Sequence, residues 1–382
     1  MTRVSVSTDL LQWAMERAGR SAKDLEPRFP KLARWLDGRE RPTLKQLEEF
    51  ARATHAPFGY FFLPQPPVED VPIPDFRTIP GAAARRPSPD LLDTIYICQQ
   101  RQEWYREYAR ITGERPFPFV GSVKITDDAV TVAADMGDAL AFDLDERRQL
   151  STWTDALRRF IEQADNLGVL VMVSGVVGSN NRRKLDPREF RGFALCDPLA
   201  PLVFINGADT RAGQMFTLAH ELAHLWLGES ALTDVEPRSA PTSAVEQWCN
   251  RVAAELLAPL DAVRAEYHAG EPIRDAMDRL ARRFKVSTLV ILRRIHDAGG
   301  ISREQLRREY DVELDRLQHV SRARGGGDFY LTTAARVSRR FARALVSSTW
   351  EGRSSFTEAF GLLGFKKMST FRELGQSVGV SV

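Results

Sequence analysis

The chain has 382 residues, of which 43% are hydrophobic and 27% are charged, and its formal net charge at pH 7 is +2. This length suggests two or three domains, and a net charge so near zero excludes a global basic field that would attract nucleic acid. Three scattered cysteines exclude a disulfide framework, and the lack of a signal-peptide core or a run of roughly 20 apolar residues predicts a cytoplasmic protein without a membrane partner.

Residues 1–63 have the pattern of several short helices. Ser21 and Thr43 are typical helix N-caps, because a side-chain oxygen at this position accepts from a backbone N–H of the first turn. Gly38 is placed to end a helix. The expected helices are Ser7 to Arg17, Ala22 to Leu25, Pro30 to Leu36 and Leu44 to Thr54.

This helical pattern resembles the helix-turn-helix domain of XRE/Cro-type regulators, on residues 21–25, 31–38 and 41–47. The resemblance implies a reading helix in the major groove of DNA, with four basic residues near phosphates or base edges: Arg28, Lys31, Arg34 and Arg39. The sequence departs from the family pattern, because Pro27 and Pro30 bound a stiff turn and the short reading helix lacks Asn, Gln and Ser. DNA binding and a helical module for packing or dimerisation therefore both remain open.

Residues 64–89 carry eight prolines, which predicts a stiff, extended linker that could run as a strap over the next domain. Helices are expected beyond it, at Leu91 to Thr112, Thr126 to Met136 and Glu146 to Asn166. The periodicity then changes to that of buried strands. The three expected strands are 168–173, 190–196 and 202–206.

A His-Glu-x-x-His pattern lies in the apolar run Phe216 to Trp226, directly after these strands. The run has helical periodicity, so His220 and His224 leave the same helix face one turn apart and can reach one metal ion. Glu221 lies beside the pair, where a carboxylate can take a proton from a water that the metal activates. The pattern predicts a zinc hydrolase centre with His220 and His224 as ligands and Glu221 as the catalytic base.

A third ligand is expected on the helix that begins near Ser243. Glu246 can complete a His-His-Glu zinc site, and Asn250, four residues later, could hydrogen-bond a ligand imidazole. Glu255 is an alternative ligand, about half a turn out of phase with Glu246, so that both cannot ligate. Three further carboxylates, Glu229, Asp234 and Glu236, lie on a loop and are worse placed. Tyr267 or His268 could donate to the oxyanion.

These motifs resemble the ImmA/IrrE family of zinc metallopeptidases. The resemblance covers residues 190–298, and it is carried by Phe216 to His224, by Glu246 with Asn250, and by Ala254 to Pro259. Ala258 stands where the family usually has Met, which changes packing and not the ligands. The family implies proteolysis of a regulatory protein, often a transcriptional repressor, in stress response or mobile-element and toxin-antitoxin control.

The fold class expected from all of this is α+β and mostly helical. An XRE-type helix-turn-helix domain (1–63) and the linker (64–89) precede a zincin-like peptidase domain (90–300) with about three strands, and a helical region (301–382) follows. Beyond residue 300, helices are expected at Thr333 to Ser347, Ser355 to Phe360 and Thr370 to Val378. The predicted function is a zinc metallo-endopeptidase that cuts a protein partner such as a repressor. The alternative is a DNA-binding regulator or antitoxin that neutralises a toxin without cutting it.

Overall fold

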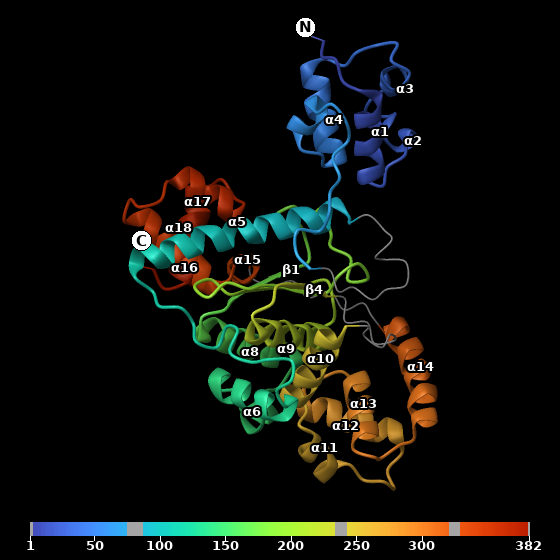
Figure 1. Ribbon diagram of the computed structural model, residues 1–382, viewed down its shortest axis with the longest axis vertical. Helices are drawn as coiled ribbons and strands as arrows, with labels where there is room; N and C mark the ends of the chain where they lie inside the picture. Colours follow the sequence, from blue (N-terminus) through green and yellow to red (C-terminus); the bar gives the residue numbers. More distant parts are fainter. Residues whose placement is uncertain (1–2, 75–86, 234–242, 321–328, 381–382) are drawn as a thin grey trace. The chain divides into compact units, whose positions relative to one another are not determined.

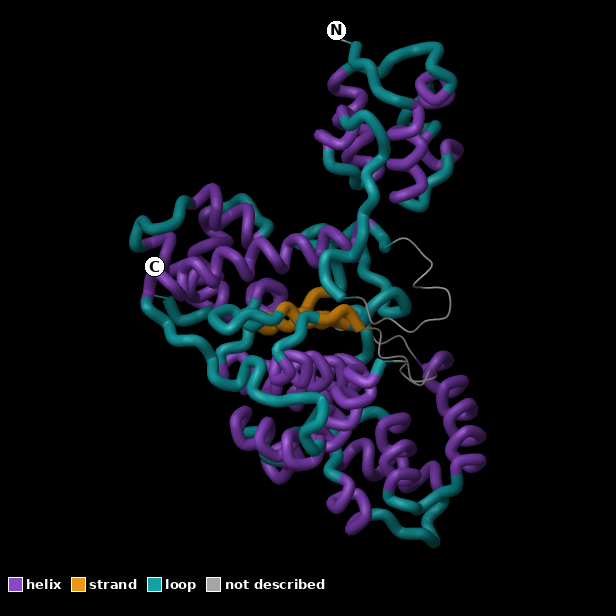
Figure 2. Tube along the Cα trace, viewed as in Figure 1, coloured by secondary structure: helices purple, strands orange, loops and turns teal. Residues whose placement is uncertain are grey.

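The computed structural model describes residues 3–74, 87–233, 243–320 and 329–380 (Figure 1). They belong to two compact units, the first formed by Met1–Pro72 and Gly81–Ile95 and the second by Ile73–Pro80 and Tyr96–Val382. Helices dominate both units, and the described strands form one small sheet in the second, so the fold class is α+β as predicted (Figure 2). No helix of the described residues is long and apolar enough to cross a bilayer.

The first unit contains the predicted short helices α1 (Thr8–Arg17), α2 (Ala22–Leu25), α3 (Leu32–Leu36) and α4 (Leu44–Thr54), followed by a 3-10 turn (Phe58–Phe62). Ser21 and Thr43 both form capping boxes, which explains where α2 and α4 begin. Phe50 is fully buried at the centre of this unit and packs edge-on against Phe29 and Phe61.

Arg17 fixes the start of the proline-rich segment to the first unit. Its guanidinium donates to the carbonyl of His55 and to the carboxylate of Glu69, both at 2.6 Å. The side chain is 4% exposed, so this ion pair is shielded from water and is stronger than a surface pair. Residues up to Glu69 are therefore held by α1.

The sheet of the second unit has the strand order β1-β3-β2-β4. Its strands are β1 (Leu170–Ser174), β2 (Gly192–Leu195), β3 (Leu202–Asn206) and β4 (Ala231–Thr233). β1 is parallel to β3, whereas β2 is antiparallel to both β3 and β4. The three predicted strands are confirmed, and β4 is an additional edge strand.

Helices cover both faces of this sheet, which is why its strands are continuous apolar runs rather than alternating ones (Figure 1). On one face, α8 (Trp153–Leu167) packs on β1, and α9 (Arg211–Leu227) packs on β2 and β3. On the other, α15 (Phe329–Val337) and α16 (Arg339–Trp350) pack on β1. α5 (Pro89–Thr112) is tied to the sheet through Gln102, which donates to the carbonyls of Leu195 and Ala200.

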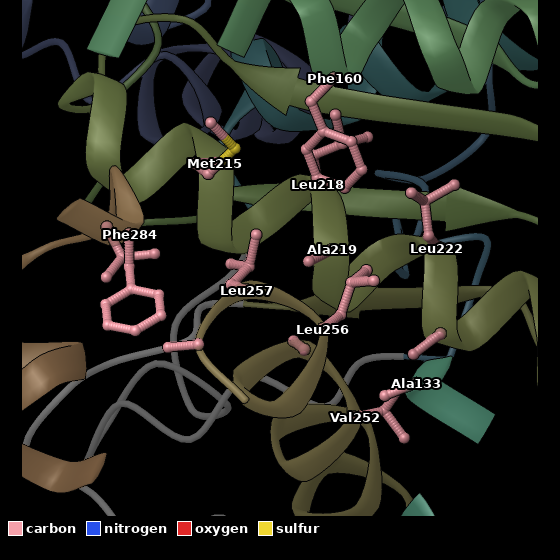
Figure 3. Close-up of a cluster of buried hydrophobic side chains, with 14 of the residues drawn as sticks. Ala133, Phe160, Met215, Leu218, Ala219, Leu222, Val252, Leu256, Leu257 and Phe284 are labelled. Carbon is pink, nitrogen blue, oxygen red and sulfur yellow. The ribbon is translucent and has the colours of Figure 1, made fainter. Parts of the chain in front are cut away.

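The largest core lies between α9 and its neighbours α8, α10 (Ala244–Leu257) and α6 (Ala129–Leu140). Figure 3 shows Leu218 and Leu222 of α9 among side chains of these elements, including Phe160 of α8 and Val252 and Leu256 of α10. Burying a side chain of this size contributes roughly 1.5–3 kcal/mol. This packing fixes α10 against α9 and so sets the distance between the polar residues that the two helices carry.

The remaining helices follow α10 in two groups. Their bounds are α11 (Leu260–Glu266), α12 (Ile273–Phe284), α13 (Thr288–Asp297), α14 (Arg303–Val320), α17 (Phe356–Leu363) and α18 (Met368–Ser377). α14 packs on α13, whereas α17 and α18 pack on α16.

Two predicted helices are in fact broken. The one expected at residues 146–166 is divided into α7 (Leu144–Gln149) and α8, because Thr152 adopts an extended backbone and caps α8 through the Asp155 N–H. The one expected at 333–347 is divided into α15 and α16 at Ser338, whose φ is 68° and whose hydroxyl accepts from the N–H of Phe341. In both cases a capping residue overrides an apolar periodicity that continues through it.

Candidate metal centre

α9 carries the His-Glu-x-x-His pattern in an uninterrupted helix. Thr210 caps its start by accepting from the Gly213 N–H at 3.0 Å, and Gly228 ends it with a φ of 78°, which a residue without Cβ adopts readily. The end at Gly228 was expected from the sequence, whereas the helix begins before the expected apolar run, at Arg211. Leu218 and Leu222 are buried in the core, and the two histidines face α10.

His220, His224 and Glu246 converge on one point. Nε2 of His220 lies 3.2 Å from Oε2 of Glu246, Nε2 of His224 lies 3.0 Å from Oε1 of Glu246, and the two Nε2 atoms are 3.2 Å apart. Four-coordinate zinc with ligands at 2.0–2.1 Å has ligand atoms roughly 3.3 Å apart, from tetrahedral geometry. The two imidazole nitrogens and the carboxylate, which meets them through different oxygens, therefore form a triangle of groups whose spacings are close to those of zinc ligands.

Hydrogen bonding within the cluster does not account for this arrangement. Both imidazoles are fully buried and Glu246 is 4% exposed, so bulk water does not reach them. If both Nε2 atoms carry a proton and donate to Glu246, the two N–H groups also face each other across 3.2 Å. If one Nε2 is unprotonated and accepts from the other, that imidazole no longer donates to Glu246. A cation that takes a lone pair from each of the three residues satisfies all of them, so the donor set fits a zinc ion.

The three side chains strongly affect one another's ionisation. Burial alone would raise the pKa of Glu246, but the charge of His220 and hydrogen bonds with both imidazoles lower it to about 2. Burial lowers the pKa of His224, whereas the adjacent Glu246 overcomes burial at His220 and raises the pKa of that imidazole. Glu246 is therefore an anion at neutral pH, as a metal ligand must be.

Glu221 is fully buried on the same helix but lies outside this triangle, against β2. Its charge raises the pKa of His220, which places it near the ligand group. A Cβ on Gly192 of β2 would lie 3.2 Å from Oε1 of Glu221 and 2.5 Å from Cγ2 of Thr217. The missing side chain at residue 192 is thus what lets α9 approach the sheet at the level of Glu221.

The other predicted site residues are distributed as follows. Asn250 lies close enough to His220 to raise its pKa, yet neither Oδ1 of Asn250 nor Nδ1 of His220 has a partner with hydrogen-bond geometry among the described residues. Glu255, the alternative ligand, instead forms an ion pair with Arg294 and accepts from the Leu260 N–H at 3.0 Å. Glu246 is therefore the carboxylate that the structure places beside the histidines.

The remaining candidates lie elsewhere. Glu229 is exposed, and Asp234 and Glu236 lie outside the described residues. The hydroxyl of Tyr267 donates to the carbonyl of Gly300 at 3.4 Å, and His268 is exposed, so neither is placed as an oxyanion donor among the described residues.

The role of Gly192 is the feature that sequence reasoning missed. A glycine inside an apolar strand often marks the close approach of another backbone or side chain. That signal was present in Arg191-Gly192-Phe193. The partner that approaches it is visible only in the structure.

The four basic residues proposed for DNA all belong to the first unit. Lys31 and Arg34 both lie beside Glu40, at 2.6 and 3.6 Å, and Arg39 lies 3.6 Å from Asp37. Arg28 lies over the ring of Phe29. The four side chains are exposed, but acidic neighbours partly neutralise three of them.

Two protein-family models match parts of the chain. Residues 164–296 match the Peptidase_M78 model, described as an IrrE N-terminal-like domain, and residues 337–377 match DUF8813, a domain of unknown function. No curated protein matches the chain. The first match runs from α8 to α13 and includes His220, Glu221, His224 and Glu246. It supports a relationship of this part of the chain to the ImmA/IrrE family and a metallopeptidase role.

Proposed function

We propose that the protein is a zinc-dependent endopeptidase that cuts a regulatory protein, such as a repressor, in stress response or in the control of mobile elements. The observation that carries this proposal is the convergence of His220, His224 and Glu246, whose nearest polar atoms lie 3.0–3.2 Å apart, next to the buried Glu221. The match to an IrrE-like peptidase domain over the same residues supports it.

His220, His224 and Glu246 would hold zinc, which leaves one of four tetrahedral positions for water or substrate. When bound, zinc supplies Lewis-acid activation of the water and of the scissile carbonyl. Glu221 would accept the proton of the attacking water on a carboxylate oxygen and deliver it to the leaving amine. Its complete burial supports this role, because water around a carboxylate would compete for the proton and screen its charge.

The competing proposal is a regulator or antitoxin that binds a partner without cutting it and contacts DNA through the first unit. The exposure of Lys31, Arg34 and Arg39 supports this proposal, although Glu40 and Asp37 partly neutralise their charges. A binding function, however, gives no reason to bury Glu221 beside a ligand triangle, since a buried carboxylate costs free energy that only a specific use offsets. We therefore place the enzyme first.

Replacing Glu221 with Gln distinguishes the two proposals. Zinc would be counted by elemental analysis, and cleavage would be followed with unfolded casein and with the proteins encoded by neighbouring genes. We expect one zinc per chain in wild type and Glu221→Gln, and a loss of roughly 10²–10⁴ in cleavage rate for the variant. Glu229→Gln, which alters an exposed acid after the same helix, is the matched control and should cut normally. The enzyme proposal would be refuted if wild type and Glu221→Gln cut at equal rates, or if elemental analysis found no zinc in the wild-type protein.

A further inference from the structure

Among the described residues, β4 is the outermost strand of the sheet, and one of its three residues directs its backbone polar groups outward. Leu232 is paired with Phe193, between the pairs Gly192 with Thr233 and Ala194 with Ala231. In an antiparallel ladder, residues alternate between directing both backbone polar groups to the neighbour and directing both away. The N–H of Leu232 points away from β2, because it donates to another segment. Leu232 is therefore the residue of this short strand that a further strand must use.

That outward N–H is taken by the chain itself. It donates to the carbonyl of Pro74 at 2.9 Å. The preceding residue, Ile73, is 8% exposed, so its side chain anchors the segment by burial. We call Ile73-Pro74 the edge segment; both residues belong to the same compact unit as β4.

The occupied edge is next to the proposed catalytic residue. Gly192, which makes room for Glu221, is paired with Thr233 at the end of β4. Neighbouring strands lie about 4.8 Å apart. An extended peptide added to β4 would thus lie about two strand spacings, roughly 10 Å, from β2, the strand on which Glu221 packs.

The two prolines limit how the edge segment can pair with β4. Pro72 and Pro74 have no N–H, so on both sides of Ile73 the segment can accept hydrogen bonds from a strand but cannot donate them. An ordinary peptide can use the N–H and the C=O of Leu232 together. A substrate residue opposite Leu232 could therefore make two hydrogen bonds, whereas Pro74 can only accept one from the Leu232 N–H.

We propose that Ile73-Pro74 is a built-in competitor of the substrate, which lies on β4 until an extended peptide displaces it. This inference rests on the proposed peptidase function, because it assigns β4 as the peptide-binding edge. If the segment occupies β4 in about nine molecules of ten, its release raises the apparent affinity for an extended peptide about tenfold.

The test uses the full-length, zinc-loaded protein in a Glu221→Gln background, so that binding is measured without cleavage. Ile73→Asp removes the apolar anchor and should release the segment. The double variant Pro72→Gly/Pro74→Gly keeps the Ile73 side chain but makes the backbone more flexible, which should also release the segment. It provides a second test if Ile73→Asp folds poorly. Ile73→Val keeps the anchor, and Val68→Asp adds the same charge at a residue that is 86% exposed; both are controls.

Two quantities are measured: hydrogen exchange of the Leu232 amide, and the affinity for fluorescein-labelled casein as an unstructured probe. We expect a protected amide in the parent and both controls, and rapid exchange with about tenfold tighter casein binding after release. Rapid exchange of the Leu232 amide in the parent, or release without tighter binding, overturns the inference.

Cleavage by the same variants with Glu221 intact separates this inference from the proposed function. If release tightens binding but no variant cuts any protein, the competitor is supported and the peptidase is refuted. If wild type cuts casein and release changes neither affinity nor rate, the peptidase is supported and the competitor is refuted.

Discussion

Gly192 of β2 lies so close to Glu221 of α9 that a Cβ at residue 192 would be 3.2 Å from Oε1 of the carboxylate. The same Cβ would be 2.5 Å from Cγ2 of Thr217 and 2.8 Å from the carbonyl of Phe204. Contacts this short force the helix or the strand to move. The position of Glu221 relative to the sheet therefore depends on the absence of a side chain at residue 192 of β2.

Gly192→Ala should accordingly damage the site and the fold together. We expect a loss of about 1–3 kcal/mol in the free energy of unfolding, as for other overpacked cores, and a fall in cleavage rate because Glu221 is displaced. Urea denaturation and a cleavage assay measure the two effects. Gly270→Ala is the control, because a Cβ there meets nothing within 4 Å. Equal stability and activity of the two variants would show that α9 does not depend on Gly192.

Glu246 and Glu255 lie on the same helix, but replacing them should affect different properties: zinc binding for Glu246 and stability for Glu255. Glu246→Gln removes the anionic ligand, so zinc affinity should fall by more than the roughly 10–100-fold typical of a residue behind the ligands. Glu255→Gln should keep zinc and lose stability, because it weakens a nearly buried ion pair with Arg294. Zinc titration and thermal denaturation of both variants provide the comparison. If Glu255→Gln lost zinc and Glu246→Gln kept it, the two assignments would be reversed.

The metal-free protein should lose stability in acid because of Glu246. Its pKa is about 2 in the folded chain and 4.5 ordinarily. Since folding lowers this pKa, the ionised carboxylate contributes stability above about pH 4.5, and that contribution is lost as the pH falls toward 2. His220, whose pKa is raised, contributes below its ordinary value of 6.5 and loses that contribution as the pH rises through its folded pKa. His224, whose pKa burial lowers, has the opposite dependence.

Urea denaturation of chelator-treated protein between pH 2 and pH 6 tests the acid limb. Glu246→Gln should flatten the fall in stability across this range, whereas Glu229→Gln, at an exposed position, should keep the wild-type slope. A wild-type slope in Glu246→Gln would mean that other carboxylates cause the acid sensitivity.

Local rules in the sequence were sufficient for the elements that carry the site. Ser243 marks the start of α10 and Gly228 the end of α9, and helical spacing placed His220 and His224 on one face; the cap at Thr210 was not predicted. Choosing between Glu246 and Glu255 needed the packing of α10 on α9. Their spacing along the helix predicts that the two acids lie on opposite faces, but not which of them faces the histidines.

What the sequence could not provide depends on contacts between distant residues. β4 has three residues and becomes a strand only by pairing with β2 and, through Leu232, with Pro74. The breaks at Thr152 and Ser338 arise where a cap competes with a periodicity that favours a longer helix. In each case a nonlocal contact or a side-chain hydrogen bond fixed the backbone conformation: a strand at β4, and a helix break at Thr152 and at Ser338.

Arg147 joins the C-terminal ends of α10 and α12. Its guanidinium donates to the carbonyl of Leu257, the last residue of α10, at 2.5 Å, and to that of Phe284, the last residue of α12, at 2.7 Å. The side chain is buried, and burial lowers its pKa to about 9. A cation at two helix C-termini is favoured by both helix dipoles as well as by the hydrogen bonds.

Arg147→Met should therefore leave two helix ends with unsatisfied carbonyls and reduce the free energy of unfolding by about 1.5–3 kcal/mol, as for other hydrogen bonds to charged groups. Arg148→Met is the matched control. Arg148 is the next residue and is 27% exposed at its side chain, and its partners Asp145 and Glu266 can be solvated instead, so its loss should cost about 1 kcal/mol or less. Urea denaturation ranks the two variants, and zinc per folded molecule should be unchanged in both. An equal loss from Arg148→Met would mean that the charge of this segment, and not the two buried carbonyls, is what stabilises the fold.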